Sequence, residues 1–221
     1  LRGHAARPPT RSAVLDLRER AASRRMRSLG QNVVVEPKRV LRYAPLAGGV
    51  EWDSVVESGP GRGSLTIAQA VAGEVVSAVE IDDVLVEVLT ETTAGRDVTV
   101  LHADAMDLDW DSLLGRRRWT LVANLPYNIS VPLICDLLDD VPCIDRMLVM
   151  VQKEVAERLV AAPGDAAYGL PSVKVAYHSR SRIVGRVPPS AFFPRPRVDS
   201  SLVVLQRLEA RAVSVDPGLL F

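Results

Sequence analysis

Short runs of β-branched residues alternate with stretches of helical periodicity from Ser54 onward, and this alternation constrains the fold more than any other feature. Five of the runs are predicted strands: Ser54–Glu57, Val75–Ile81, Val98–Ala103, Thr120–Ala123 and Met147–Val151. Between and after them we expect helices near Ser64–Ala72, Asp83–Thr92, Val131–Leu138 and Lys153–Ala161. Strands that alternate with helices pair in parallel through right-handed crossovers, so the sequence predicts a doubly wound α/β domain.

The pattern changes after Gly169. Three further segments are predicted strands separated by loops, and we expect them to extend the sheet as an antiparallel edge: Val173–Tyr177, Arg182–Val187 and Ser201–Leu205. Apolar residues make up 48% of the chain, which supplies a full hydrophobic core. No apolar run is long enough to span a membrane, and the scattered histidines and two cysteines predict no metal site.

The charge is distributed unevenly, although the formal net charge is +0. Residues 1–28 carry eight arginines and two acidic residues, and a short helix is predicted over Val14–Met26. Residues 174–211 again carry eight basic residues and two acidic ones, whereas the middle of the chain is acidic. Lys and Arg bind polyanions by displacing counterions from phosphates, so the basic ends permit a nucleic-acid partner. A solvated arginine-rich tail explains the same pattern.

A glycine-rich loop follows the first predicted strand and opens a helix, with Gly59 and Gly61 in the order Gly-Pro-Gly-Arg-Gly. Such glycines let the backbone approach a ligand closely. The second strand ends at Glu80, where a carboxylate can accept both hydroxyls of a ribose, and the third ends beside Asp104. The loop lacks dinucleotide spacing and a phosphate-binding lysine. These features together favour a nucleoside site for S-adenosylmethionine.

The fourth strand ends in Asn124-Leu125-Pro126-Tyr127-Asn128. The exocyclic amine of a base is a poor nucleophile because its lone pair is delocalised into the ring. The Asn124 side-chain oxygen and the Leu125 carbonyl could accept both amine hydrogens and free that lone pair, with Pro126 fixing the turn. Tyr127 could stack on the base. Taken alone, the tetrapeptide Asn124–Tyr127 is also compatible with a purely structural strand-end turn that contains a packed tyrosine.

The chain resembles the KsgA-type ribosomal RNA adenine dimethyltransferases, which are relatives of the erythromycin-resistance methyltransferases. The resemblance runs in order from about residue 28 to 208. Its matching stretches include Leu29–Asn32, Glu57–Thr66, Val79–Asp82, Asp104-Ala105, Asn124–Ile129, Val151–Leu159, Tyr168-Gly169 and Val187–Val204. The Gln152–Leu159 block followed by Tyr168-Gly169 looks more like KsgA than like the resistance enzymes.

The resemblance implies a Rossmann-like class I S-adenosylmethionine-dependent methyltransferase fold with a mostly parallel seven-stranded sheet. It implies dimethylation of N6 of two adjacent adenosines in small-subunit (16S-type) rRNA during ribosome biogenesis. The cofactor pocket would be lined by Asn32, the Val34 backbone, Gly59, Glu80, Asp104 and Asn124. Phe192 would stack on the target adenine opposite Tyr127, with Phe193 as the neighbouring possibility. The target must leave its stack, so looped or single-stranded RNA of the pre-ribosomal small subunit is the expected partner.

The resemblance also divides the chain into three parts: a basic arm over 1–28, a methyltransferase domain over 29–208, and the start of a truncated C-terminal helical domain over 209–221. The family's helical domain is therefore expected to be largely missing. The sequence departs from the family at Val33, Ser58 and Arg62, around the methionine end of the pocket, which bears on cofactor affinity.

Two alternatives stay open at this point. A large-subunit rRNA adenine methyltransferase that confers macrolide resistance would use the same chemistry. A non-catalytic RNA-binding assembly factor or transcription factor could retain the fold without the activity. We expect a monomer in the cytoplasm in each case.

Overall fold

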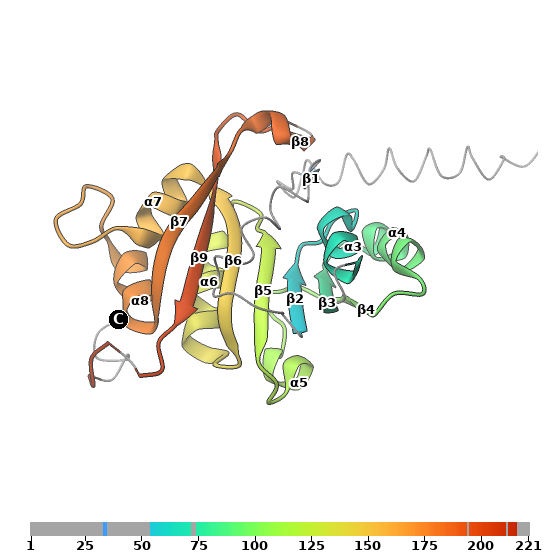
Figure 1. The fold of residues 1–221 in the computed structure, drawn as a ribbon, viewed down its shortest axis with the longest axis horizontal. Coiled ribbons are helices and arrows are strands. Elements are labelled where there is room, and N and C mark those ends of the chain that lie inside the picture. Colours follow the sequence, from blue (N-terminus) through green and yellow to red (C-terminus); the bar gives the residue numbers. More distant parts are fainter. Residues whose placement is uncertain (1–32, 35–53, 72–73, 194, 211, 216–221) are drawn as a thin grey trace, which may run out of the picture.

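The computed structural model describes residues 33–34, 54–71, 74–193, 195–210 and 212–215. Within these ranges, one seven-stranded sheet dominates (Figure 1). The predicted basic arm over 1–28, its helix over Val14–Met26 and Asn32 lie outside the described residues. No helix among the described residues is long and apolar enough to cross a membrane.

The strands of the large sheet are arranged in the order β4-β3-β2-β5-β6-β9-β7. Their bounds are β2 Ser54–Ser58, β3 Val75–Glu80, β4 Val98–His102, β5 Trp119–Asn124, β6 Ile144–Gln152, β7 Ser179–Val187 and β9 Ser200–Arg207. Strands β2 to β6 pair in parallel, and β9 is antiparallel to both of its neighbours, β6 and β7. The prediction of a mostly parallel seven-stranded sheet is confirmed, and its antiparallel pairing is concentrated in the single strand β9.

A second, two-stranded sheet joins distant parts of the chain. Strand β1, Val33–Val34, pairs antiparallel with β8, Phe192–Phe193, with Val34 opposite Phe192. The 3-10 helix η2, Pro189–Ala191, leads into β8. The proline-rich segment after β7 is thereby connected to residues that precede the strands of the large sheet in the sequence.

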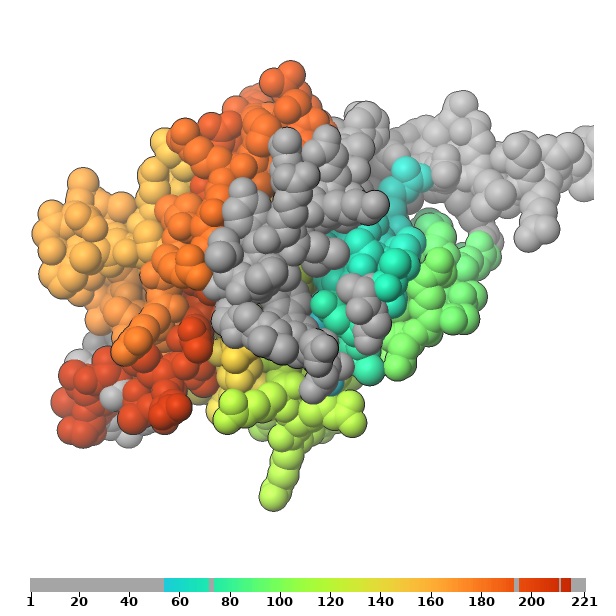
Figure 2. All heavy atoms as spheres, viewed as in Figure 1, coloured from blue at the N-terminus to red at the C-terminus, as the bar shows by residue number. Residues whose placement is uncertain are grey.

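Helices cover both faces of the large sheet. Their bounds are α3 Ser64–Val71, α4 Asp83–Thr93, α5 Trp110–Leu114, α6 Ser130–Asp140, α7 Lys153–Val160 and α8 Leu170–His178. Figure 1 shows α3 and α4 beside β2, β3 and β4, and α6, α7 and α8 beside β6, β7 and β9. The connection between α7 and α8 projects from the surface at the left of the space-filling view (Figure 2).

The core consists of two layers, one on each face of the sheet. Successive residues of each central strand belong to opposite layers, as Leu121 and Val122 do on β5, and Leu148 and Val149 on β6. This follows from the two-residue side-chain period of a strand. Because both faces are covered at the centre of the sheet, β5 and β6 are mainly apolar on both faces, whereas the edge strand β7 is partly exposed and alternates serine with arginine at its start. This burial explains why the sequence signalled strands by runs of β-branched residues.

One predicted element is wrong. Val173–Tyr177 was expected as a strand, but these residues lie within helix α8. The helix begins after Gly169, whose backbone N–H donates to Ser172 Oγ at 3.1 Å, and Pro171 occupies its first turn. Val175 and Tyr177 are buried against neighbouring elements. Tertiary packing on α6 and α7 therefore overrides the strand preference of the β-branched residues.

The other elements agree with the prediction to within a few residues at their ends, apart from α5, η2 and the short strands β1 and β8, which were not predicted. Residues 209–210 and 212–215 form bends, and the Tyr177 hydroxyl donates to the Val215 carbonyl at 2.8 Å. The expected helical domain over 209–221 extends into residues outside the description, so it stays a prediction.

Candidate active site

The strand order reverses between β2 and β5, and the candidate site lies at that point. From β2 the chain moves outward to β3 and β4, and after returning to β5 it moves outward in the other direction to β6. Loops that leave the carboxyl ends of β2 and β5 therefore diverge and leave a crevice. Ser58 and Gly59 lie at one side of this crevice, and Asn124 to Ile129 lie at the other.

The glycine-rich loop after β2 needs glycine at two positions for different reasons. Gly59 has φ +70, and a Cβ there would lie 3.7 Å from Pro126 Cδ and 3.9 Å from the Asn124 carbonyl oxygen. Any larger side chain would therefore extend into the space between the two loops. Gly63 has φ +77, and a Cβ there would lie 2.5 Å from the end of the Leu89 side chain. A side chain at this position would displace the end of Leu89 and would be strained by the positive φ, so glycine is favoured where the loop packs on α4.

Glu80, at the end of β3, is tied to the glycine-rich loop. One of its carboxylate oxygens accepts from the Gly61 N–H at 3.0 Å, and the other accepts from the N–H groups of Ile81 and Asp82, also at 3.0 Å. The side chain is only 1% exposed. These three bonds use most of the positions at which a carboxylate can accept hydrogen bonds. Glu80 therefore holds the loop in shape, and a ribose would share its carboxylate with the backbone.

Glu57 is a second buried carboxyl group beside the loop. It is 2% exposed, and Thr66 Oγ1 donates to its Oε2 at 2.7 Å. Burial, reinforced by the nearby charge of Glu80, raises the pKa of Glu57 to about 8, although the Thr66 hydrogen bond opposes the shift. Glu57 is therefore largely protonated at neutral pH.

Asp104 follows β4 at the same edge of the sheet. Its Oδ1 accepts the Met106 N–H at 2.9 Å, which folds the chain back so that Ala105 and Met106 line the crevice. A carboxylate in this place could accept a hydrogen bond from an amine at the far side of a bound nucleoside.

The loop between β5 and α6 forms the opposite wall. Its Leu125 N–H donates to the Met150 carbonyl at 3.2 Å, and the Leu125 side chain is buried in the core. The Ile129 N–H donates to the Pro126 carbonyl at 3.2 Å, which closes a tight turn. Both contacts fix the backbone on either side of Tyr127.

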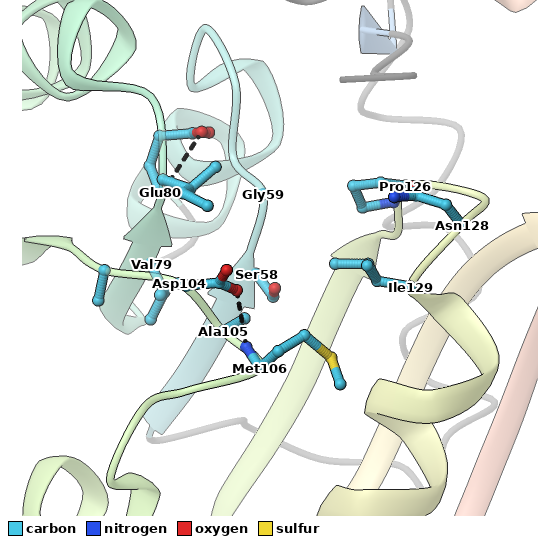
Figure 3. A pocket seen from close by; sticks show the side chains of 12 residues that line it. Ser58, Gly59, Val79, Glu80, Asp104, Ala105, Met106, Pro126, Asn128 and Ile129 are labelled. Atoms are coloured by element: carbon cyan, nitrogen blue, oxygen red, sulfur yellow. Dashed lines mark hydrogen bonds between the residues drawn. The ribbon is translucent and has the colours of Figure 1, made fainter. Parts of the chain in front are cut away.

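One pocket brings these segments together (Figure 3). Figure 3 shows Val79, Glu80, Asp104 and Met106 on one side, with Pro126, Asn128 and Ile129 on the other. The lining is Ser58, Gly59, Val79, Glu80, Ile81, Ala103, Asp104, Ala105, Met106, Pro126, Asn128 and Ile129. Apolar walls with acidic groups from two neighbouring strand ends suit a nucleoside with polar edges.

The predicted site residues are distributed as follows. Gly59, Glu80, Asp104 and Pro126 line the common pocket. Asn124 lies at the end of β5, with its carbonyl oxygen beside Gly59, and Gly61 contributes through its bond to Glu80. Tyr127 is half-buried in the same loop. Val34 is in β1, opposite Phe192.

Phe192 has a different environment from the one that stacking on a base requires. It is 4% exposed and packs in the core layer that contains Leu65, Val187 and Leu202. It does not line the pocket within the described residues. The side chain of the alternative residue, Phe193, lies outside the described part of the chain. The stacking role of Phe192 thus stays a prediction, and it requires this ring to leave its core contacts.

Several residues that line the pocket were not among the predicted site residues, notably Met106, Asn128 and Ile129. Each lies within two to five residues after a predicted strand-end motif, so the direction in which the chain turns after the strand places them in the wall. No feature of residue type distinguishes these positions from ordinary loop residues.

The doubly wound sheet and the strand-end site define a class I S-adenosylmethionine-dependent methyltransferase. The pocket residues fit that cofactor, since Gly59 leaves space beside Pro126 and carboxylates stand at two successive strand ends. A family model described as ribosomal RNA adenine dimethylase matches residues 22–216. The chain belongs to this family.

Curated relatives and solved structures agree with the family. The chain is 46% identical over 202 residues to ribosomal RNA small subunit methyltransferase A of Kineococcus radiotolerans, covering 89% of this chain and 67% of that protein. It is 43% identical over 214 residues to the protein of the same name from Mycobacterium avium, covering 94% of this chain and 67% of that protein. The chain thus spans about two thirds of the length of these relatives.

Two solved structures are similar to this fold, each with a TM-score of 0.70. A dimethyladenosine transferase from Plasmodium falciparum is 28% identical, with 80% of this chain and 64% of that chain covered. The 23S rRNA methyltransferase ErmE is 26% identical, with 83% and 73% covered.

Proposed function

We propose that this chain transfers methyl groups from S-adenosylmethionine to N6 of two adjacent adenosines in small-subunit rRNA and acts in ribosome biogenesis. The observation that carries the proposal is that the Asn124–Tyr127 loop leaves β5 directly beside Gly59, and that Pro126 in this loop lines the same pocket as Glu80 and Asp104. The names of the curated relatives support a small-subunit substrate.

In this proposal, residues at the carboxyl ends of β2, β3 and β4 would hold the cofactor. Glu80 would accept hydrogen bonds from the ribose hydroxyls, and Asp104 would accept one from the adenine amine. The remaining contacts are assigned to Asn32, the Val34 backbone, Gly59, Gly61 and Asn124. When bound, S-adenosylmethionine supplies an electrophilic methyl group on a positively charged sulfur. The apolar side chains of Met106 and Ile129 are suited to cover the faces of the nucleoside.

The chain's own task is to make a delocalised amine nucleophilic. The Asn124 side-chain oxygen and the Leu125 carbonyl accept the two hydrogens of N6, which favours a pyramidal nitrogen with its lone pair directed at the methyl group. The Leu125 backbone is suited to this because its N–H is bonded to Met150 and its side chain is buried. The proton leaves N6 after methyl transfer, so no strong general base is required.

Tyr127 stacks on the target adenine in this proposal, and Phe192 or Phe193 covers the opposite face. Stacking of a base on an aromatic ring contributes about 1–3 kcal/mol, which offsets part of the cost of leaving the RNA stack. The substrate is therefore looped or single-stranded RNA of the pre-ribosomal small subunit. The proposal includes a monomer that acts in the cytoplasm.

Labelled S-adenosylmethionine and immature small subunits test the proposal directly. We expect label in dimethyladenosine at two adjacent positions of the small-subunit rRNA. Calorimetry with S-adenosylmethionine provides the matched control, because binding without labelled RNA would contradict the proposed substrate while leaving the cofactor site intact.

The similarity to ErmE makes large-subunit rRNA the second candidate substrate. Supplying small and large subunits in the same labelling reaction, followed by mapping of the modified nucleotides, separates the two. Label confined to the large subunit would replace our proposal with the second candidate.

A further inference from the structure

Two buried serine hydroxyls contact Tyr127, one at its side-chain hydroxyl and one at its backbone carbonyl. The Tyr127 and Ser200 hydroxyls are hydrogen-bonded at 3.3 Å, and Ser130 Oγ donates to the Tyr127 carbonyl at 3.2 Å. Ser200 is 1% exposed and Ser130 is 0% exposed, whereas Tyr127 is half-buried. The ring thus spans the distance from the β5–α6 loop to the start of β9.

Ser200 is a rigid anchor because of its place in the sheet. It is the first residue of β9 and pairs with Gln152 of β6 on one side and with Val187 of β7 on the other. Next to it, the Lys153 N–H donates to the Asp199 carbonyl at 3.0 Å. A hydroxyl fixed between two paired strands has little freedom to follow a moving loop.

Tyr127 needs such an anchor if its ring receives a base. The residue lies in a short loop, where rotation about the side-chain torsions would otherwise let the ring plane vary. Stacking requires the ring face to be parallel to the incoming base. The Tyr127 hydroxyl lies on the axis about which the ring rotates, so its hydrogen bond to Ser200 fixes the direction of that axis. Because a phenolic O–H prefers to lie in the plane of its ring, the same bond also favours one ring plane before the substrate arrives, which removes part of an ordering cost from binding.

We propose that Ser200 is a positioning residue that holds the Tyr127 ring ready to stack on the target adenine, an inference that rests on the proposed function. Ser200 acts only through Tyr127 and does not touch the base. The expected consequence is weaker RNA binding when the serine hydroxyl is lost, with the affinity for S-adenosylmethionine unchanged.

The steady-state test compares Ser200→Ala, Tyr127→Phe and the double variant, with Ser201→Ala as control. Ser201 is 2% exposed and is adjacent on the same strand, so its side chain points to the opposite face. We expect Ser200→Ala and Tyr127→Phe each to raise KM for the RNA about fivefold, as the loss of one hydrogen bond predicts. The double variant should match the single ones, because both changes break the same contact. Multiplicative effects, or an equal effect of Ser201→Ala, would overturn the inference.

A second measurement does not depend on turnover. The chain has four tyrosines, so 3-fluorotyrosine labelling gives a simple fluorine spectrum in which Tyr127→Phe identifies one resonance. Ser200→Ala should shift and narrow that resonance as the ring gains motion, while Ser201→Ala leaves it unchanged. An unaltered Tyr127 resonance in Ser200→Ala would refute the positioning role. Absence of methyl transfer by the wild-type chain would instead count against the proposed function alone.

Discussion

The pocket side of the sheet, β2 to β5, differs from the opposite side, β6, β9 and β7, in where its buried polar groups find partners. On the pocket side, Glu57 and Glu80 bond to groups between 1 and 19 residues away. On the opposite side, Arg207 bonds to carbonyls 63 to 70 residues away. The buried carboxyl groups of the pocket side thus find their partners within short sequence segments, whereas Arg207 finds its partners across much of the domain.

Arg207 shows how the far side is built. Its guanidinium donates to the carbonyls of Leu137, Leu138 and Val141, at the end of α6, and to that of Ile144, at 2.8–3.2 Å. These carbonyls lie where a helix runs out of internal donors. Asp139, in the same turn, binds Lys174 at 2.6 Å and His178 at 2.8 Å, both on α8. The pocket side of the domain therefore contains the candidate active-site residues, whereas the buried polar groups of the other side stabilise the packing of its helices.

The strongest way to test this comparison is Asn124→Ala on the pocket side. Loss of an acceptor that acts mainly in the transition state should lower kcat about 100- to 1000-fold, with little change in melting temperature. Asn128→Ala, four residues further along the loop, serves as control and should lower turnover less than about tenfold. Labelled-methyl kinetics on small subunits provides the measurement. Equal losses in both variants would remove the special role of Asn124.

Glu80→Gln should give the next largest effect. The amide directs an N–H group at one of the backbone donors that Glu80 now accepts from, so we expect the Kd for S-adenosylmethionine to rise about 10- to 100-fold. Calorimetry checks this value, and Glu91→Gln on the exposed side of α4 is the matched control. An unchanged Kd would show that Glu80 is needed for neither the loop nor the ribose.

Arg207→Met tests the side of the sheet that is formed by β6, β9 and β7. Loss of the guanidinium removes four hydrogen bonds and should lower the free energy of unfolding by about 2 kcal/mol, since the Leu137 and Val141 carbonyls keep a backbone N–H as donor. The Kd for the cofactor should stay the same, because the affected groups lie far from the pocket in the sheet order. Urea denaturation and calorimetry measure the two quantities, with exposed Arg117→Met as control. A change in cofactor affinity would mean that the two sides are coupled.

The smallest expected effect is a pH dependence of the free energy of unfolding that comes from Glu57. Its pKa is about 8 in the folded chain and 4.5 when unperturbed, so the folded state holds one more proton between these values. Stability should therefore fall as the pH rises from 4.5 towards 8, by at most about 1.4 kcal/mol per pH unit. Burial also raises the pKa of Glu74 to about 7, which adds the same trend at lower pH. The comparison with Glu57→Gln is therefore made above pH 7.

Denaturation at pH 7.0 and at about pH 8 gives the measurement. Glu57→Gln should lose most of the pH dependence in this interval, with a small remainder from Glu74, whereas Glu74→Gln, the control, should retain most of it. A wild-type chain whose stability is constant over the interval would mean that Glu57 is already ionised in the folded state.

The pocket side could be predicted from the sequence because its information is local. A parallel strand, its glycine-rich or acidic end and the following helix are consecutive in the chain, so Gly59, Glu80 and Asp104 follow from the pattern of residues. On the far side, the strands were predicted, but α8 and its packing were not. The β-branched residues in 173–177 indicated a strand, but contacts with α6 and α7 place them in a helix.

The pattern of residues alone predicted the fold class, the parallel pairing of the first strands, the acidic strand ends and the family resemblance, because strand periodicity and motifs are properties of adjacent residues. Only the tertiary structure decided that β9 lies between β6 and β7, that Arg207 completes the end of α6, and that Ser200 meets Tyr127. The contacts of Arg207 and Ser200 join residues about 70 positions apart, and their formation depends on packing energies summed over the whole domain.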